Sequence, residues 1–167
     1  MTRIIGLDPG LARTGWGIVE AAGSALAFVA AGVVASDAGA PLAIRLDTLY
    51  RGLAGIIRRF RPAEAAVEET VVNRNPATSL RLGQARGVVL LAAAHAGLPV
   101  AEYAARRVKR AVTGTGGADK TQVATMVRVL LPAAGPVEGD AADALAVAIC
   151  HAHHRATQRR IAAALGP

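Results

Sequence analysis

The chain opens with Ile4-Ile5-Gly6-Leu7-Asp8-Pro9-Gly10, and a second apolar run, Thr14-Gly15-Trp16-Gly17-Ile18-Val19, follows it closely. An apolar run that is broken by Asp-Pro-Gly and then resumed by an alternating run predicts a β-hairpin. Asp8 would then lie at the end of the first strand. A third apolar stretch, residues 25–36, extends the hairpin to a three-stranded antiparallel meander.

Asp8 has two interpretations at this position. Aspartate and proline are common turn residues, so Asp8 could serve only to begin the turn. An ionised carboxylate among apolar strand neighbours, however, costs several kcal/mol unless a cation or hydrogen-bond donors compensate it. The second interpretation therefore assigns Asp8 to a metal ion or a phosphate, and this stretch alone does not decide between the two.

Length and composition favour one domain, residues 1–167, with a core of small apolar side chains. The chain is 53% hydrophobic but only 3% aromatic, so Ala, Val, Leu and Ile must pack closely. A chain of this length buries about 70% of the surface of its unfolded form, which is enough for a stable core without disulfides. The single cysteine, Cys150, and the lack of a signal-peptide pattern at the start favour a cytoplasmic location, and no segment predicts a membrane span.

The charge balance favours a polyanionic partner. The formal net charge is +7, and 17 of the 19 basic residues are arginine, whose planar fork suits phosphate. The preference for arginine over lysine also fits codon bias in a G+C-rich genome, so it decides little. The positive balance itself still favours nucleic acid.

The middle of the chain predicts a parallel crossover. Apolar residues recur at helical spacing over residues 42–60, and residues 64–70 then predict a short strand that carries Glu68 and Glu69. A strand that follows a helix in this way indicates a parallel connection. Because strand side chains alternate, only one of the two glutamates can share a site with Asp8, and periodicity does not choose between them.

The next segments predict a long helix over residues 76–96 and a short strand over residues 100–102. Gly83 and Gly87 lie inside this helix, where each costs roughly 1 kcal/mol relative to alanine. We therefore expect the sheet or another subunit to approach the helix closely at these glycines. Residues 104–117 are first basic and then glycine-rich, and no element is assigned to them.

Two further helices are expected, one capped by Asp119 and running to Leu131, the other over residues 138–151. The last helix opens with Asp140 and Asp143, whose spacing places both carboxylates on one face, about 5 to 6 Å apart at Cβ. Acidic residues in a first turn are also favoured by the helix dipole, which is a structural explanation for the pair.

Together, these segments supply four carboxylates in an otherwise basic chain: Asp8, one strand-end glutamate, Asp140 and Asp143. Oxygen ligands of this kind suit Mg²⁺ or Mn²⁺. Two such ions about 4 Å apart can activate water and stabilise the leaving oxygen of a phosphodiester. The residues alone thus point to metal-assisted phosphodiester chemistry.

The order and content of these motifs resemble the RuvC family of bacterial Holliday-junction resolvases. The similar segments span almost the whole chain: Ile5-Gly6-Leu7-Asp8-Pro9-Gly10, Thr14-Gly15-Trp16-Gly17, Val67-Glu68, Leu82-Gly83-Gln84-Ala85-Arg86-Gly87, Glu102-Tyr103-Ala104-Ala105-Arg106, Val108-Lys109, Lys120-Thr121-Gln122-Val123 and Asp140-Ala141-Ala142-Asp143-Ala144-Leu145-Ala146. The resemblance implies an RNase H-like α/β fold, with a five-stranded mixed sheet (antiparallel meander plus parallel strands) flanked by helices. It also implies a homodimer that makes paired nicks across a four-way DNA junction.

The resemblance further implies roles for individual residues. Two Mg²⁺ or Mn²⁺ ions per active site would be held by the catalytic acids, which fall on Asp8, Glu68, Asp140 and Asp143. It thereby selects Glu68 over Glu69, which becomes a neighbour facing elsewhere. A branch-migration helicase and its junction-binding loader, similar to RuvB and RuvA, are the expected partners.

For DNA, the resemblance places Lys109 and Lys120 along the DNA path. Four arginines are expected to make further phosphate contacts, namely Arg74, Arg81, Arg86 and Arg106. Val71 stands where the family often carries an aromatic residue that stacks on a base at the junction centre, and valine has no ring for this. His95 and Cys150 are interpreted as structural. Three histidines near the end of the chain are interpreted as solvated or partly packed, namely His151, His153 and His154.

Three other functions remain as alternatives. An RNase H-like nuclease acting on structured RNA would share the fold. An actin-like ATPase also begins with a strand followed by Gly, Asp and Gly, but it needs a second similar lobe, which this chain does not offer. A catalytically silent nucleic-acid-binding module would leave the four acids without a purpose.

Overall fold

In this computed structural model, residues 1–69 and 74–165 are described. They form a five-stranded mixed sheet in the order β3-β2-β1-β4-β5. The strand bounds are Thr2–Asp8 (β1), Arg13–Ala22 (β2), Ala25–Ala35 (β3), Glu64–Glu68 (β4) and Val100–Tyr103 (β5). The pairs β1–β2 and β2–β3 are antiparallel, whereas β1–β4 and β4–β5 are parallel. The meander and the parallel crossover expected from the sequence are thus confirmed.

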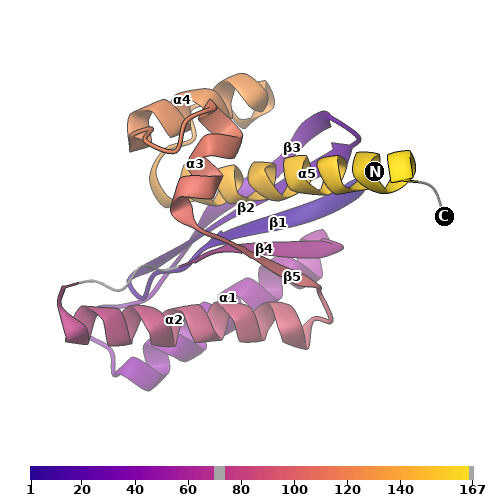
Figure 1. Ribbon diagram of the computed structural model, residues 1–167. Coiled ribbons are helices and arrows are strands. Elements are labelled where there is room, and N and C mark those ends of the chain that lie inside the picture. Colours follow the sequence, from indigo (N-terminus) through magenta and orange to yellow (C-terminus); the bar gives the residue numbers. More distant parts are fainter. Residues whose placement is uncertain (70–73, 166–167) are drawn as a thin grey trace.

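Helices cover both faces of the sheet (Figure 1). On one face lie α1 (Leu42–Phe60) and α2 (Pro76–His95), and on the other lie α3 (Ala105–Thr113), α4 (Lys120–Leu130) and α5 (Gly139–Leu165). A short 3₁₀ turn, Pro132–Ala134, joins α4 to α5. Each face has its own apolar core, because side chains of one strand point alternately to the two helical layers. In β1, Ile4 packs with the α5 layer and Ile5 with the α1–α2 layer.

The long helix α5 lies unusually close to the sheet. A Cβ on Gly6 would overlap the backbone carbonyl oxygen of Ala144, and a Cβ on Gly15 would overlap that of Asp140. Only glycine at these strand positions lets the helix backbone approach the strands so closely. The small residues of the opening motif therefore place the first turns of α5 directly against β1 and β2.

Four expectations from the sequence need correction. The last helix continues to Leu165, well beyond the expected residue 151. Residues 105–113 form helix α3, to which no element was assigned. The fourth strand ends at Glu68 and not at Thr70, which lies outside the described residues. The sheet does not approach Gly83 or Gly87, because a Cβ at either glycine would meet nothing within 4 Å in the described part of the chain. An approach by another subunit stays a prediction.

Candidate active site

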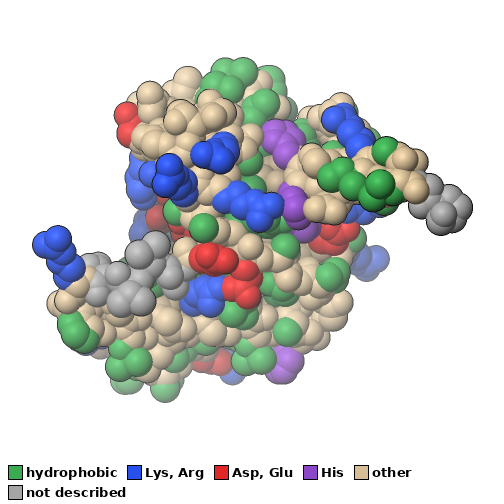
Figure 2. Space-filling view, in the orientation of Figure 1, with side chains coloured by type: hydrophobic (Ala, Val, Ile, Leu, Met, Phe, Trp, Pro, Cys, Tyr) green, Lys and Arg blue, Asp and Glu red, His purple; other side chains and the backbone are tan. Residues whose placement is uncertain are grey.

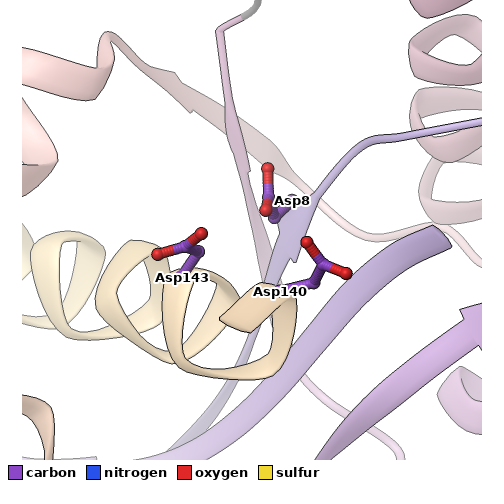
Figure 3. A group of neighbouring side chains, drawn as sticks. All are labelled: Asp8, Asp140 and Asp143. Carbon is purple, nitrogen blue, oxygen red and sulfur yellow. The ribbon is translucent and has the colours of Figure 1, made fainter. Parts of the chain in front are cut away.

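The four predicted acids meet at one edge of the sheet. Asp8 ends β1 and Glu68 ends the neighbouring parallel strand β4, so both carboxylates emerge at the same edge. Asp140 and Asp143 lie in the first turns of α5, which the glycine contacts hold against that edge. Carboxylate oxygens of Asp8, Asp140 and Asp143 all lie within 4.8 Å of one another, and Figure 3 shows Asp8 facing the two helix residues.

Glu68 is the strand-end glutamate that belongs to the site. It lines a pocket together with Asp8 and Asp143, whereas Glu69 is exposed beyond the end of β4. The backbone N–H of Glu69 donates to the carbonyl oxygen of Tyr103, which continues the strand pairing by one bond. The choice of Glu68 over Glu69, which rested on resemblance, agrees with this geometry.

The pocket is short of positive charge. Burial, followed by the negative charges of the neighbouring acids, raises the pKa of Asp8 from 3.8 to about 7. Burial and the charge of Asp143 likewise raise the pKa of Glu68. The nearby lysines oppose these shifts without cancelling them. A partly buried group of carboxylates in a chain of net charge +7 fits a divalent metal ion, which would offset the repulsion and the lost hydration.

Two lysines line the same pocket as the acids. Nζ of Lys120 lies 3.2 Å from Oδ2 of Asp143, and this hydrogen bond raises the pKa of Lys120. Lys120 begins α4 directly after Asp119, whose side chain accepts from the backbone N–H of Gln122 in a capping box. Lys109 projects from α3 into the pocket. The sequence placed both lysines near DNA, and the structure places them beside the acids.

One charged residue of the site was missed by the sequence analysis. Nε of Arg13, the first residue of β2, lies 2.8 Å from Oδ2 of Asp140. The sequence feature that could have identified Arg13 is its position two residues before Gly15. Because side chains alternate along a strand, both residues lie on the face that α5 covers. That face could be recognised only after α5 had been placed against Gly15.

The other expected DNA contacts lie in different surroundings. Arg74, Arg81 and Arg106 are exposed. Arg86 is not brought to the pocket, since it forms an ion pair with Glu102 of β5 and its side chain is only 22% exposed. Val71 lies outside the described residues.

The histidines form contacts away from the acids. His151 on α5 lies between Glu64 and Tyr103, with Nε2 2.8 Å from Oε2 of Glu64 and Nδ1 2.8 Å from the Tyr103 hydroxyl. Arg155, one turn further along α5, donates to the other oxygen of Glu64 at 2.7 Å. These contacts confirm the expectation that His151 is partly packed.

Other residues interpreted as structural also have identifiable contacts. Nδ1 of His153 lies 3.2 Å from the carbonyl oxygen of Ala111, and Nδ1 of His154 lies 3.0 Å from a guanidinium nitrogen of Arg107. The exposed ring of His95 meets the Tyr50 hydroxyl at 2.7 Å. Burial raises the pKa of Cys150 to about 11, so this thiol is unreactive. Among residues 1–69 and 74–165, Asp8, Asp140 and Asp143 are the only group spaced to hold a metal ion.

The fold and the acids define a metal-dependent nuclease of the RNase H-like class. Residues 4–151 match the family described as crossover junction endodeoxyribonuclease RuvC. The protein of that name from Xanthobacter autotrophicus is 60% identical over 163 residues, which cover 98% of this chain and 96% of the relative. The one from Acidiphilium cryptum is 61% identical and covers 97% of each chain.

Solved structures agree with the sequence relatives. RuvC of T. thermophilus in complex with a Holliday junction substrate superposes with a TM-score of 0.87 at 33% identity, covering 95% of this chain and 97% of that one. This chain belongs to the RuvC family of crossover junction endodeoxyribonucleases. Membership favours this activity over the structured-RNA nuclease, the actin-like ATPase and the silent binding module. In the two described segments, no helix is long and apolar enough to span a membrane.

The raised pKa of Asp8 predicts a pH-dependent stability for the metal-free protein. The folded protein holds the Asp8 proton more tightly than the unfolded chain does, so stability is lost as pH rises from about 4 to about 7. An asparagine in place of Asp8 is neutral over this whole pH range, so it does not lose stability in this way. In EDTA, we expect Asp8→Asn to unfold like the wild type near pH 4 but to be up to about 4 kcal/mol more stable at pH 8.

Urea unfolding at both pH values measures this difference. Addition of Mg²⁺ at pH 8 should stabilise the wild type and leave Asp8→Asn much less affected, because the variant lacks a carboxylate that we expect to bind the ion. A difference between the two proteins that does not depend on pH would show that Asp8 is not protonated near neutral pH in the folded state.

Proposed function

We propose that this chain, acting as a single nuclease domain, resolves four-way DNA junctions with two Mg²⁺ or Mn²⁺ ions held by Asp8, Glu68, Asp140 and Asp143. The observation that supports this most directly is the meeting of three aspartates within 4.8 Å, in a chain of net charge +7. Carboxylate oxygens at this spacing suit hard divalent ions. When bound, such ions activate water and stabilise the leaving oxygen of a phosphodiester.

The protein's own residues orient the reaction. The end of β1 fixes Asp8, and the first turns of α5 fix the two other aspartates against it. Lys109 and Lys120 line the pocket and would bind the DNA phosphates that flank the bond to be cut. The partial burial of Asp8 and Glu68 keeps the site's electrostatic interactions strong, because little water screens them.

The DNA would extend from the pocket over the exposed surface of α3. This helix carries Arg106, Arg107 and Arg110, all exposed, and basic side chains gather over it in Figure 2. Arg74 and Arg81, close to the start of α2, would contact a second part of the junction backbone. Arg107 and Arg110 were not among the DNA contacts expected from the sequence, so they enlarge the expected interface.

A homodimer would explain paired nicks, because a four-way junction offers two equivalent strands to a two-fold assembly. The side of α2 that carries Gly83 and Gly87 supports this proposal. A Cβ at either glycine would meet no described atom of its own chain within 4 Å, so a second helix can approach. A branch-migration helicase and its junction-binding loader, similar to RuvB and RuvA, would supply the junction.

The proposed activity is tested by an incision assay on matched substrates. The purified protein is mixed with a four-way junction labelled on two opposing strands, with duplex DNA and with structured RNA, in Mg²⁺, Mn²⁺ or EDTA. We expect cuts at the same position on both opposing strands of the junction, only with a divalent ion. Faster cutting of RNA, or of duplex, would overturn the proposal.

The lysines of the pocket give a second prediction. Lys109→Ala and Lys120→Ala should each weaken junction binding and each lower the slope of log affinity against log salt by about one, as the loss of one phosphate contact does. Binding is measured by fluorescence anisotropy over a salt series. Unchanged slopes in both variants would remove these lysines from the DNA path.

A further inference from the structure

Arg13 contacts Asp140, whereas Lys120 contacts Asp143, so the two cations meet different aspartates of the acid group. The pocket that holds Asp8 and Asp143 is lined by Lys109 and Lys120, and it includes neither Arg13 nor its partner Asp140. Nε of Arg13 lies 2.8 Å from Oδ2 of Asp140. Cations therefore flank the acids on two sides.

The position of Arg13 is fixed by the sheet. In the β1–β2 ladder Asp8 pairs with Gly15, and a Cβ on Gly15 would overlap the backbone of Asp140. Arg13 is two residues earlier on the same strand and so points to the same side. The adjacent Thr14 is fully buried, and its hydroxyl donates to the carbonyl oxygen of Gly10 at 2.8 Å, which anchors the start of the strand.

The ion pair between Arg13 and Asp140 is weak enough for another cation to replace Arg13. The Arg13 side chain is 61% exposed and that of Asp140 is 33% exposed, and ion pairs in such surroundings contribute little to stability. A divalent ion would compete for the same Asp140 oxygen with a higher charge. Its binding would leave a planar, exposed guanidinium beside the site, and this group is suited to grip a phosphate through two parallel hydrogen bonds.

We propose that Arg13 binds a DNA phosphate on the flank of the active site opposite Lys109 and Lys120, and that its ion pair with Asp140 holds it there until a divalent ion takes Asp140. The backbone of the cut strand would then be gripped on both sides of the scissile bond. This inference rests on the proposed function, since it needs both DNA and a metal ion in the site.

The test compares Arg13→Gln with the wild type in junction binding, by anisotropy over a salt series. It is performed once in EDTA and once in Ca²⁺, a hard ion that binds oxygen ligands, and a gel verifies that the DNA stays intact. In Ca²⁺, we expect the slope of log affinity against log salt to be lower by about one in the variant than in the wild type. In EDTA, the two slopes should be equal, because Arg13 of the wild type stays paired with Asp140 and does not bind phosphate. Arg13→Lys, which keeps the charge, should retain the slope in Ca²⁺.

Arg51→Gln is the matched control. Nε of Arg51 lies 2.8 Å from a carboxylate oxygen of Asp47, the same distance as in the Arg13 pair, and its side chain is 78% exposed. It lies on α1, across the sheet from α5 (Figure 1). Its substitution should leave the salt slope unchanged in both solutions.

Two results would overturn the inference. An unchanged slope for Arg13→Gln in Ca²⁺ would remove the phosphate contact, and an equal loss in EDTA and in Ca²⁺ would remove the exchange with the metal ion. If the wild type incises junctions and Lys109→Ala lowers the slope while Arg13→Gln does not, only this inference fails. If the wild type does not incise junctions at all, the proposed function fails.

Discussion

Asp8→Asn is expected to abolish junction incision while it preserves junction binding. Carboxylate oxygens of Asp8, Asp140 and Asp143 lie within 4.8 Å of one another, so the variant would lose one of the proposed metal ligands. The basic surface is untouched, and phosphate contacts dominate affinity. A rate at least about 10³-fold lower, equivalent to about 4 kcal/mol of barrier, is the expected magnitude.

Single-turnover incision and anisotropy, measured on the same preparation, separate the two effects. Asp143→Asn should behave like Asp8→Asn, whereas Asp47→Asn on the outer helix α1 should cut normally. Simultaneous loss of binding and folding in Asp8→Asn would make Asp8 a structural residue. A fully active Asp143→Asn protein would exclude Asp143 from the ligand set.

Gly15→Ala should destabilise the fold and suppress incision together. A Cβ at this position would overlap the carbonyl oxygen of Asp140, so the first turn of α5 must move away from β2. Overpacking of this kind costs about 1 to 3 kcal/mol. The same movement would separate Asp140 from Asp8, and misplacement by about 1 Å can cost 10²-fold in rate.

Gly55→Ala provides the comparison. Gly55 lies inside α1, and a Cβ there would meet nothing within 4 Å among the described atoms. Alanine favours a helix interior over glycine by about 1 kcal/mol, so this variant should be slightly more stable and fully active. Urea unfolding and incision are measured on both variants. Wild-type activity in Gly15→Ala would show that α5 does not need this close approach.

Local patterns predicted much of the fold. The bounds of α1, residues 42–60, were predicted from an apolar stripe that repeats over five turns. Helix α3 was missed because it is short, buries only Val108 and Val112, and has at its N-cap Ala104, which offers no side-chain hydrogen bond. A nine-residue helix with so few signals depends on packing against the rest of the protein, which local sequence does not reveal.

The acids and the two lysines of the pocket could be named from the sequence, but Arg13 could not. Asp140 and Asp143 carry a helical spacing, and resemblance to a known family selected Glu68. The partner of Arg13 lies 127 positions away along the chain, so no local pattern connects them. Arg86, which was expected to contact a phosphate, forms an ion pair with Glu102 of β5, and its contact with DNA stays a prediction.

The short strand β4 has a mechanical consequence for the site. Its last residue, Glu68, lines the acidic pocket, and its first residue, Glu64, holds both His151 and Arg155 of α5. Helix α5 is thus fastened to the sheet at a second point, more than two turns beyond Asp143. Contacts at two points along its length restrain the helix from sliding along the sheet or turning about its own axis. This restraint favours a constant spacing between the aspartates of α5 and Asp8.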